Sequence, residues 1–547
     1  MRGSRRARRD RVSMQDKTDI PVLVVGAGPV GLALAAELGR LGIGCIVVEK
    51  RDGTVPVPKM SQVSARNMEF CRRWGIADTV RKAGWPEDYP GDIVYQRSFL
   101  GPELARLKIP SYASRDRQPF TPESPCHCPQ IFFDPILAAH VKTLPCVDLR
   151  YNIALESLAQ EEDIVKAELR DGETGAREQI TARYLVGCDG PGGAVRDALG
   201  IGLGGLGVFA HSINIFFRSP EMIKLHDKGW GRFHRSIDET GCWSEMIAID
   251  GKELYRLTVF DEPSRDADAE AYLRRLFGGD FPHEIIDVTY WERRDFVAER
   301  YRVGRAFIAG DAAHQCSPTG GYGMHTGIEE AANLAWKLAA VIAGWGGDAL
   351  LESYESERQP IARRNVTLGT EAFRAITGVP AITAEAAERA AAGEEEPSVQ
   401  ALRAVFAEFS GSDYQKFQYA YEDSPICIAD GTPPPPFEKF SFTPSARPGA
   451  RAPHAWLEDG TSILDLFGTG FTLLKLGAAP PDTQGWIRAA KRRNVPMTEI
   501  AIIDPAVAEL YGAPLVLVRP DGHVAWRGNA CPDEPMAAID RIRGAAA

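Results

Sequence analysis

The sequence predicts an α/β protein in which a doubly wound sheet is interrupted by a mixed β-sheet and followed by a small α/β domain. A strand, a glycine-rich turn, a helix and a second strand are expected over residues 20–49, which is the opening unit of a doubly wound sheet. Two further apolar strands, at 182–188 and 306–309, each end in a Gly/Asp signal. Between them, residues 209–218, 242–250 and 253–260 have the alternating or clustered pattern of a separate sheet.

The length of 547 residues predicts several packed units. Helices are expected at 328–343, 350–364 and 383–396, with Thr383 as an N-cap. A polyproline-like stretch follows before a last α/β segment. The predicted domains are a disordered basic tail (1–18), a nucleotide-binding domain interleaved with a substrate domain (19–375, substrate part about 85–120 and 205–295), a helical and Pro-rich linker (376–445) and a C-terminal domain (446–547).

Composition and charge exclude several classes of function. The net charge of -11 argues against a nucleic-acid partner, which would normally require a basic face. No run of eighteen apolar residues is present, so no membrane span is expected. The ten cysteines are scattered and no secretory signal precedes them, which predicts reduced thiols in a cytoplasmic protein. Cys126-His127-Cys128 lacks a second ligand pair, so no metal site is expected.

The glycine-rich turn has the spacing of a dinucleotide-binding fingerprint. Gly26 permits the tight turn, Gly28 lets a pyrophosphate approach the backbone, and Gly31 lets the helix pack on the strand. Glu49 ends the second strand, where a carboxylate can accept ribose hydroxyls, and Lys50 beside it is also a candidate cofactor contact. This motif by itself does not distinguish FAD from NAD.

Two later segments make that distinction. Asp189-Gly190 follows one strand, and Gly310-Asp311 follows another and precedes the loop 318–324. With these three motifs in this order, residues 19–364 resemble the class A flavoprotein aromatic hydroxylases, the family of para-hydroxybenzoate, phenol and chlorophenol hydroxylases. Residues 451–468 and 515–522 resemble the thioredoxin-like tail of phenol hydroxylase relatives, although they contain no Cys-x-x-Cys pair.

The resemblance implies a Rossmann-type FAD-binding domain interleaved with a mixed β-sheet substrate domain, and it implies roles for particular residues. Asp311 would accept from the ribityl or ribose hydroxyls of FAD, and Asp189-Gly190 would support both FAD and the nicotinamide nucleotide. The loop under the flavin would contain Gly321, Gly323 and Met324, preceded by Pro318 on the substrate side. The remaining candidates for cofactor contacts are Gln130, Lys59 and Arg66.

The resemblance further implies a monooxygenase in which NADH or NADPH reduces FAD and O₂ adds to the flavin at C4a. The resulting hydroperoxide would hydroxylate a small aromatic substrate, best a phenol, with nitro- and halogen-substituted phenols among the candidates. A polyketide-type hydroxylase of secondary metabolism and a non-catalytic flavin-binding protein are the alternatives. A flavin-dependent halogenase is disfavoured because no two tryptophans stand two positions apart. A homodimer is expected.

Two departures from the family pattern bear on the chemistry. His325 stands where relatives commonly have Asn, and a flavin contact is the favoured interpretation. Ser61 stands where phenol-binding relatives often have a His or Asp that helps to deprotonate the substrate. Other candidates for handling the substrate's proton or its phenolate are His314, which is as well explained as a cap on its loop, and Tyr255 with Arg256, which are equally well explained as ordinary strand residues.

Overall fold

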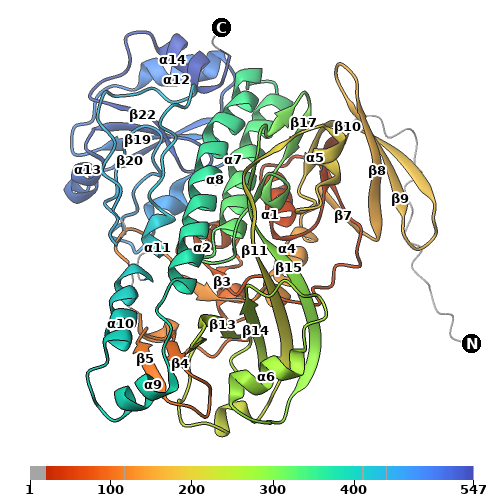
Figure 1. Ribbon diagram of the computed structural model, residues 1–547. Coiled ribbons are helices and arrows are strands. Elements are labelled where there is room, and N and C mark those ends of the chain that lie inside the picture. The colour runs from red at the N-terminus through yellow and green to blue at the C-terminus, as the bar shows by residue number, and fades with distance from the viewer. Residues whose placement is uncertain (1–19, 116–117, 410–411, 439, 546–547) are drawn as a thin grey trace, which may run out of the picture.

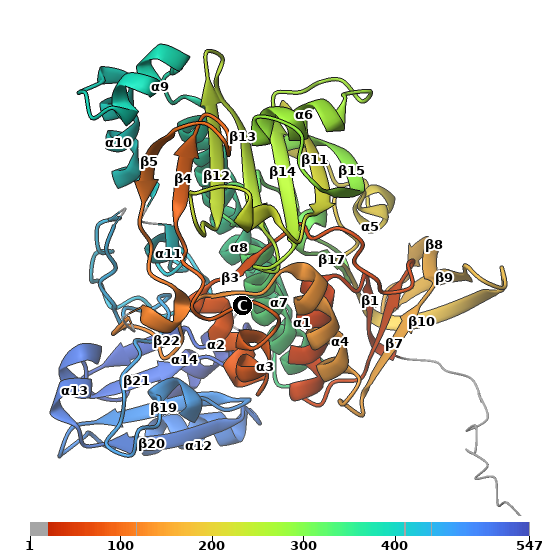
Figure 2. The same cartoon turned by 90° about the horizontal axis from the view of Figure 1, so that it is seen from below.

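A computed structural model of the chain describes residues 20–115, 118–409, 412–438 and 440–545. The basic tail predicted at 1–18 lies outside these residues. No helix in the described part is long and apolar enough to cross a membrane. Figures 1 and 2 show the C-terminal domain and the β8–β9 hairpin on opposite sides of a helical and sheet body, from which a second sheet projects.

The first sheet is the predicted doubly wound sheet. Five neighbouring strands, in the order β17, β10, β1, β2 and β7, run parallel, and β16 and the β8–β9 hairpin add to them by antiparallel pairing. The strands are β1 (Ile20–Val25), β2 (Cys45–Glu49), β7 (Val147–Tyr151), β8 (Ile153–Gln160), β9 (Val165–Asp171), β10 (Arg177–Gly187), β16 (Arg302–Val303) and β17 (Ala306–Ile308). The four strands expected for this sheet are therefore present and adjacent.

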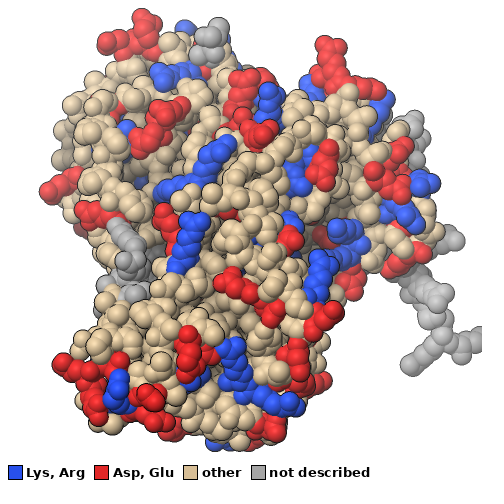
Figure 3. Space-filling view, viewed as in Figure 1, with Lys and Arg blue, Asp and Glu red and all other residues tan. Residues whose placement is uncertain are grey.

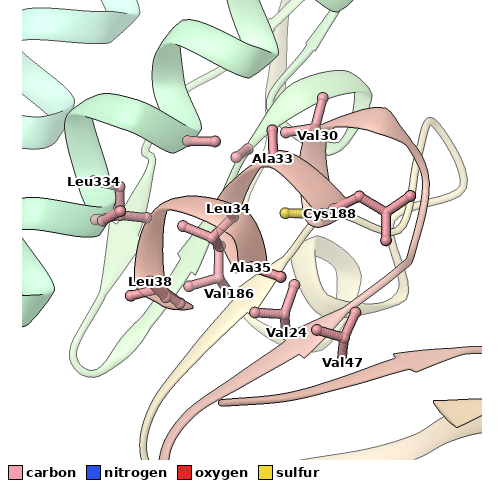
Figure 4. Packing of buried hydrophobic residues seen from close by; sticks show 14 of the residues in the cluster. Val24, Val30, Ala33, Leu34, Ala35, Leu38, Val47, Val186, Cys188 and Leu334 are labelled. Atoms are coloured by element: carbon pink, nitrogen blue, oxygen red, sulfur yellow. The ribbon is translucent and has the colours of Figure 1, made fainter. Parts of the chain in front are cut away.

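Helix α1 (Pro29–Arg40) packs between this sheet and α7 (Gly323–Ile342). Its apolar residues recur three or four positions apart, and Leu34 and Leu38 lie beside Val186 of β10 and Leu334 of α7 (Figure 4). Full burial of a leucine contributes roughly 1.5–3 kcal/mol, so this cluster holds the helix firmly. The packing places the N-terminus of α1 at the carboxyl ends of β1 and β10.

The second sheet is mixed and has the order β18-β15-β11-β14-β13-β12-β4-β5. One face packs on α6 (Ala269–Phe277), and the other faces the carboxyl ends of the first sheet. The strands are β4 (Ile93–Gln96), β5 (Glu103–Leu107), β11 (Leu203–Arg218), β12 (Phe233–Asp238), β13 (Gly241–Ala248), β14 (Leu254–Phe260), β15 (Glu284–Ala298) and β18 (His314–Gln315). Strand β15 escapes sequence reasoning because charged residues interrupt its apolar pattern, yet it pairs with β11 along its length.

The helices between the second sheet and the C-terminal domain differ in length from those expected. Helix α8 (Asp348–Thr377) runs past the predicted end at 364 with Pro360 inside it. The predicted N-cap is confirmed, since the Thr383 hydroxyl accepts from the amide of Ala386 at 3.2 Å at the start of α9 (Ala384–Ala391). Within the segment predicted to be helical and then a Pro-rich linker, α10 (Pro397–Phe409) packs against the edge strand β5, where the sequence suggested an exposed linker. Other short elements are β3 (Gln62–Val63), α2 (Ala65–Arg73), α3 (Ala77–Arg81), β6 (Cys126–His127), α4 (Gln130–Val141), α5 (Ala194–Ala198) and α11 (Ser412–Gln415).

The C-terminal domain has the predicted thioredoxin-like arrangement. Its sheet has the order β20-β19-β21-β22, with β19 and β20 parallel and the other pairs antiparallel. The elements are β19 (Phe471–Leu476), α12 (Gln484–Arg492), β20 (Met497–Ile502), α13 (Pro505–Tyr511), β21 (Leu515–Val518), β22 (Val524–Gly528) and α14 (Pro535–Ile542). Cys531 is a free thiol. A role of this domain in assembly, like the homodimer itself, stays a prediction.

A buried ionic network joins the C-terminal domain to α7 and α8. The carboxylate of Glu357 accepts from both terminal nitrogens of Arg519, at 2.6 and 2.9 Å, and from Lys337 Nζ at 2.6 Å. Arg519 also binds Asp521, and the side chains of all four residues are at most 2% exposed. Burial opposes a charge on Glu357, but the two cations outweigh burial and lower its pKa from 4.5 to about 2. The network therefore works as an interdomain clamp.

Replacing Arg519 by methionine should leave Glu357 and Asp521 buried without their main cation, at a cost of about 3–5 kcal/mol in the free energy of unfolding. Thermal and urea unfolding followed by circular dichroism measures this loss. The matched control is Arg493→Met in the same domain, whose bond to Asp540 is partly exposed and should contribute less than about 1 kcal/mol.

The same pair of variants predicts a pH dependence. Because the pKa of Glu357 is lowered, its contribution to stability is present above pH 4.5 and is lost as the pH falls toward about 2. The stability difference between the parent and Arg519→Met should therefore narrow over this range. A difference that stays constant, or equal losses in the two variants at neutral pH, would contradict the clamp.

Candidate active site

One large cavity lies between the carboxyl ends of the first sheet and the facing side of the second sheet. Its volume is about 1570 Å³, larger than the roughly 300–1,000 Å³ of a pocket for one drug-sized ligand. Its wall combines the glycine-rich turn, the loops 53–62, 189–192 and 318–325, and strands β11 to β15. The space is sufficient for a dinucleotide beside a second ligand.

The glycine-rich turn has the geometry of a phosphate cradle. A Cβ atom on Gly26 would lie 2.3 Å from the carbonyl oxygen of Cys188, and one on Gly31 would lie 1.9 Å from that of Gly26. These two glycines are therefore required by packing. A Cβ on Gly28 would meet no atom within 4 Å, so this position is open toward the cavity at the N-terminus of α1. A pyrophosphate fits there against the helix amides.

The neighbouring polar residues on this side of the cavity are preorganised by backbone contacts. Glu49 accepts from the amides of Ala27, at 2.9 Å, and Arg51, at 3.1 Å. The Gln130 side chain accepts from the amide of Lys59 at 3.3 Å and donates to Asp134 at 2.9 Å. These contacts fix the orientation of Glu49 and Gln130, and both residues line the cavity together with Lys50 and Lys59.

The two predicted acidic motifs meet at the same place. Asp189 accepts from the amide of Val195 at 3.0 Å, while its second carboxylate oxygen is buried without a partner among the described residues. Asp311 is exposed to the cavity, and desolvation by the protein around it raises its pKa. Gly190 and Gly310 line the cavity next to them. Unused acceptors of this kind suit the hydroxyl groups of a ribose or a ribityl chain.

The loop at residues 318–324 ends in the first turn of α7, which begins at Gly323. Pro318, Gly321, Gly323 and Met324 all line the cavity, so the amides of the helix N-terminus face it. His325 follows them. Its Nδ1 donates to the carbonyl oxygen of Gly321, and its Nε2 accepts from the amide of Ser64 at 3.0 Å.

His325 therefore joins the loop to the β3 segment through both ring nitrogens. Its ring also lines the cavity, but the predicted flavin contact through a ring nitrogen would have to replace one of these bonds. The histidine in place of asparagine thus has a clear structural use. Tyr322 of the same loop is held by a hydrogen bond to Gln415 of α11, a residue that sequence reasoning assigned to a linker.

Alternation along β14 decides which of two neighbouring candidates faces the cavity. Arg256 lines the cavity, as do its ladder partner Ile247 and, beyond it, Phe233. Tyr255 points to the opposite face, where it stacks on Phe217 and donates to the carbonyl oxygen of Lys252 at 3.2 Å. The prediction that Tyr255 binds or deprotonates a substrate is therefore wrong, because successive side chains of a strand face opposite sides.

Ser61 lines the cavity, and its partner there is a cation. Arg232 Nη2 donates to Ser61 Oγ at 3.3 Å, and Arg232 Nη1 lies 3.3 Å from the hydroxyl of Tyr112. Arg232 is only 7% exposed and has no carboxylate within 4.0 Å among the described residues. Sequence reasoning missed Arg232, because it immediately precedes β12 and belongs to no motif.

Two other predicted site residues do not reach the cavity. His314 is buried, with Nε2 3.2 Å from a carboxylate oxygen of Glu330 that also accepts from the amide of Gly310. His314 thus holds the Glu330 carboxylate that caps the Gly-Asp loop, which is a structural role, and the prediction that His314 is catalytic is wrong because it does not line the cavity. Arg66 pairs with Glu69 at 2.7 Å and packs on Phe70, so its predicted place at the pyrophosphate or the flavin cleft is also wrong.

A phosphate cradle, two acidic motifs for sugar hydroxyls and an adjoining sheet-lined chamber define a flavoprotein that acts on a second ligand. Residues 19–368 match the family model of the FAD binding domain, and residues 445–546 match the aromatic-ring hydroxylase C-terminal domain. The chain belongs to this family of FAD-dependent aromatic-ring hydroxylases. It is thus a flavin monooxygenase, and NADH or NADPH is its co-substrate.

Its relatives are named for different compounds. The solved structure of the rebeccamycin biosynthetic enzyme RebC with reduced flavin is 38% identical, with a TM-score of 0.87 over 97% of this chain and 99% of that one. The 4-methyl-5-nitrocatechol 5-monooxygenase of a Burkholderia species is 31% identical over 96% of this chain and 97% of its own length. The tetracenomycin B2 monooxygenase-dioxygenase of Streptomyces olivaceus is 31% identical over 96% and 98%.

Substituting valine for Gly28 should abolish FAD binding without unfolding the chain. The added side chain meets no protein atom within 4 Å of its Cβ, so it occupies only the space where the pyrophosphate would approach. Flavin absorbance of the purified protein measures occupancy. Gly468→Val is the control, because Gly468 is equally open but lies in the C-terminal domain away from the cavity. A Gly28→Val protein with full flavin content would refute the cradle.

Proposed function

We propose that the protein hydroxylates a phenol that binds as its phenolate, with the phenolate oxygen accepting hydrogen bonds from both the Ser61 hydroxyl and the Arg232 guanidinium. The observation that carries this proposal is the 3.3 Å contact between Ser61 Oγ and Arg232 Nη2 on the cavity wall. Ser61 stands where a base is expected in phenol-binding relatives, and a hydroxyl cannot hold the phenol's proton at neutral pH. The buried guanidinium acts instead on the charge that deprotonation leaves behind.

A nearby positive charge favours the ionised form of a phenol. An opposite charge within about 4–6 Å typically lowers an acid's pKa by about 1–3 units. Arg232 would thus bring phenols with an ordinary pKa near 10 closer to neutral pH, and the proton would leave to solvent. Ionisation raises the electron density of the ring, which suits an electrophilic oxygen donor. Arg232 thereby takes the part that a base has in relatives.

The rest of the wall positions the ring. FAD, when bound and reduced by NADH or NADPH, supplies activated oxygen from O₂. Pro318 and Thr319 line the cavity beside the loop that would carry the flavin, while Phe233 and Ile247 provide an apolar surface across from them. Residues of the second sheet and of α8 line this chamber, and exclusion of water by such walls would protect the activated oxygen. A substrate of two or more fused rings is compatible with the cavity volume of about 1570 Å³.

The rate of hydroxylation should depend on the ionisation of the substrate. In the parent, NAD(P)H oxidation should be well coupled to product for acidic phenols such as nitrophenols, and less well coupled for unactivated phenols at neutral pH. Arg232→Gln should move the pH at which an unactivated phenol is half-maximally hydroxylated upward by about 1–2 units. Nitrophenols, already ionised, should show almost no shift. Product and hydrogen peroxide are measured together to obtain the coupling.

Ser61→His tests the same idea in the opposite direction. An imidazole at this position can accept the proton, and a general base contributes roughly 10²–10⁴-fold where it is needed. The variant should therefore hydroxylate unactivated phenols faster and leave nitrophenols nearly unchanged. Equal coupling in the parent across phenols of widely different pKa, with no shift in Arg232→Gln, would contradict the proposal.

A further inference from the structure

The buried arginines of the protein divide into two groups. Nine arginines are buried among the described residues, and six of them have a carboxylate partner within 4.0 Å, namely Arg66, Arg196, Arg235, Arg358, Arg451 and Arg519. The other three, Arg232, Arg256 and Arg293, have no such partner in the described part of the chain. On the outer face seen in Figure 3, by contrast, acidic and basic side chains are interspersed.

The three arginines without a carboxylate all donate hydrogen bonds to loops on the nucleotide side of the cavity. Arg232 and Arg256 donate to the loop 53–62, the first to a hydroxyl and the second to a backbone carbonyl. Arg293 on β15 donates instead to the loop that precedes α7. Because burial of a cation is costly, such contacts need a reason beyond the stability of the second sheet. Those of Arg293 concern the loop that would carry the flavin.

Arg293 is held in one orientation from its own side of the cavity. Its Nε donates to Ser212 Oγ on the neighbouring strand β11 at 3.0 Å. Its guanidinium carbon lies 4.0 Å from the ring centre of Phe373 on α8 and 4.9 Å from that of Trp291. These ring faces attract the cation in place of a carboxylate. Burial lowers the pKa of Arg293 from 12.5 to about 9, which still leaves the side chain charged at neutral pH.

This fixed donor binds both residues that flank Pro318. Arg293 Nη1 donates to Ser317 Oγ at 3.2 Å and to Thr319 Oγ1 at 3.3 Å. The two hydroxyls are also hydrogen-bonded to each other at 3.3 Å, and Ser317 is fully buried. Pro318 lines the cavity between them. The three contacts form a closed ring that ties Pro318 to the second sheet.

The turn that begins at Pro318 depends on such an anchor. The amide of Gly321 donates to the carbonyl oxygen of Pro318 at 3.0 Å, and both Gly320 and Gly321 have left-handed backbone conformations, with φ of 83° and 64°. Glycines lose more conformational freedom on folding than any other residue, so a turn built on them is easily deformed. His325 anchors the far end of this turn through the carbonyl oxygen of Gly321. Arg293 anchors the near end.

We propose that Arg293 is a positioning residue that holds the loop 317–321, and with it the place of the flavin ring, at a set distance from the substrate wall of the second sheet. The inference rests on the proposed function for the choice of a phenol as substrate. Oxygen transfer requires the ring carbon and the activated oxygen to meet in one geometry, and a misplacement of about 1 Å can lower such a rate about a hundredfold. Reduction of the flavin by the nicotinamide nucleotide involves no such meeting and should be spared.

The first test requires no turnover. Hydrogen–deuterium exchange is measured on the FAD-loaded enzyme without substrate. In Arg293→Lys, which retains the charge but not the planar fork, the amides of 319–322 should exchange at least about tenfold faster than in the parent. The amides of β19 in the C-terminal domain are the internal reference. Arg274→Lys is the matched control, because Arg274 forms an exposed ion pair with Asp280 at the end of α6 and should leave the exchange unchanged.

The second test measures turnover of 4-nitrophenol. In Arg293→Lys the rate of flavin reduction by NADH or NADPH should not change, whereas the product formed per nucleotide oxidised should fall about tenfold, with hydrogen peroxide as the remainder. Ser317→Ala combined with Thr319→Val removes the partner hydroxyls and should cause the same loss. Adding Arg293→Lys to this pair should have little further effect, because the same contacts are already lost. FAD content and melting temperature show that each variant is folded.

Four results would overturn the inference. They are unchanged exchange of 319–322 in Arg293→Lys, coupling in that variant equal to the parent's, losses that add in full when the three substitutions are combined, and an equal fall in flavin reduction and hydroxylation. The last would assign Arg293 to the flavin or the nicotinamide nucleotide itself. If the parent forms no product from 4-nitrophenol, the proposed function falls, and the exchange of 319–322 still decides whether Arg293 holds the loop.

Discussion

The close approach of three backbone segments at the carboxyl end of the first sheet determines where the rest of the site can lie. Gly26 touches the backbone that follows β10, Gly31 touches Gly26, and Gly310 lies against Val30, so that a Cβ on any of them would come within 3 Å of another atom. Without these glycines, α1 could not start beside β1 and β10. The phosphate cradle, Asp189 and Asp311 all depend on this junction.

The second sheet contributes its chemistry through alternation. Its strands present one set of side chains to α6 and the other to the cavity. Of two adjacent residues on β14, Tyr255 therefore faces α6 and Arg256 faces the cavity. The cavity-facing set combines an apolar surface with several guanidinium groups. Because the strands are held by neighbours on both sides, these groups are positioned by backbone ladders rather than by flexible loops.

Buried charge has two different uses in this molecule. In the clamp around Glu357, cations and carboxylates satisfy one another and hold the C-terminal domain on α7 and α8. In the cavity, Arg232 and Arg256 are buried without carboxylate partners among the described residues. The first arrangement strengthens the association of domains, whereas the second leaves positive charge on the cavity wall that no carboxylate of the described residues neutralises.

The sequence by itself determined the order of the domains, the doubly wound sheet and the nucleotide side of the site. These features depend on short-range patterns, namely glycine spacing, apolar strands and an acidic residue at a strand end. Such patterns can be recognised in a single sequence without knowledge of the tertiary structure. For the same reason, the candidates Gly28, Glu49, Asp189 and Asp311 lie together on the cavity wall.

Only the tertiary structure decided the substrate side. Ser61 and Arg232 are 171 positions apart in the chain, and their contact depends on how the β3 segment meets the second sheet. The His314 ring is bonded to the buried carboxylate of Glu330 and does not line the cavity. Gln415 lines the cavity and binds Tyr322, although the sequence placed it in a linker. Such contacts arise from packing between distant segments, and no pattern within either segment encodes them.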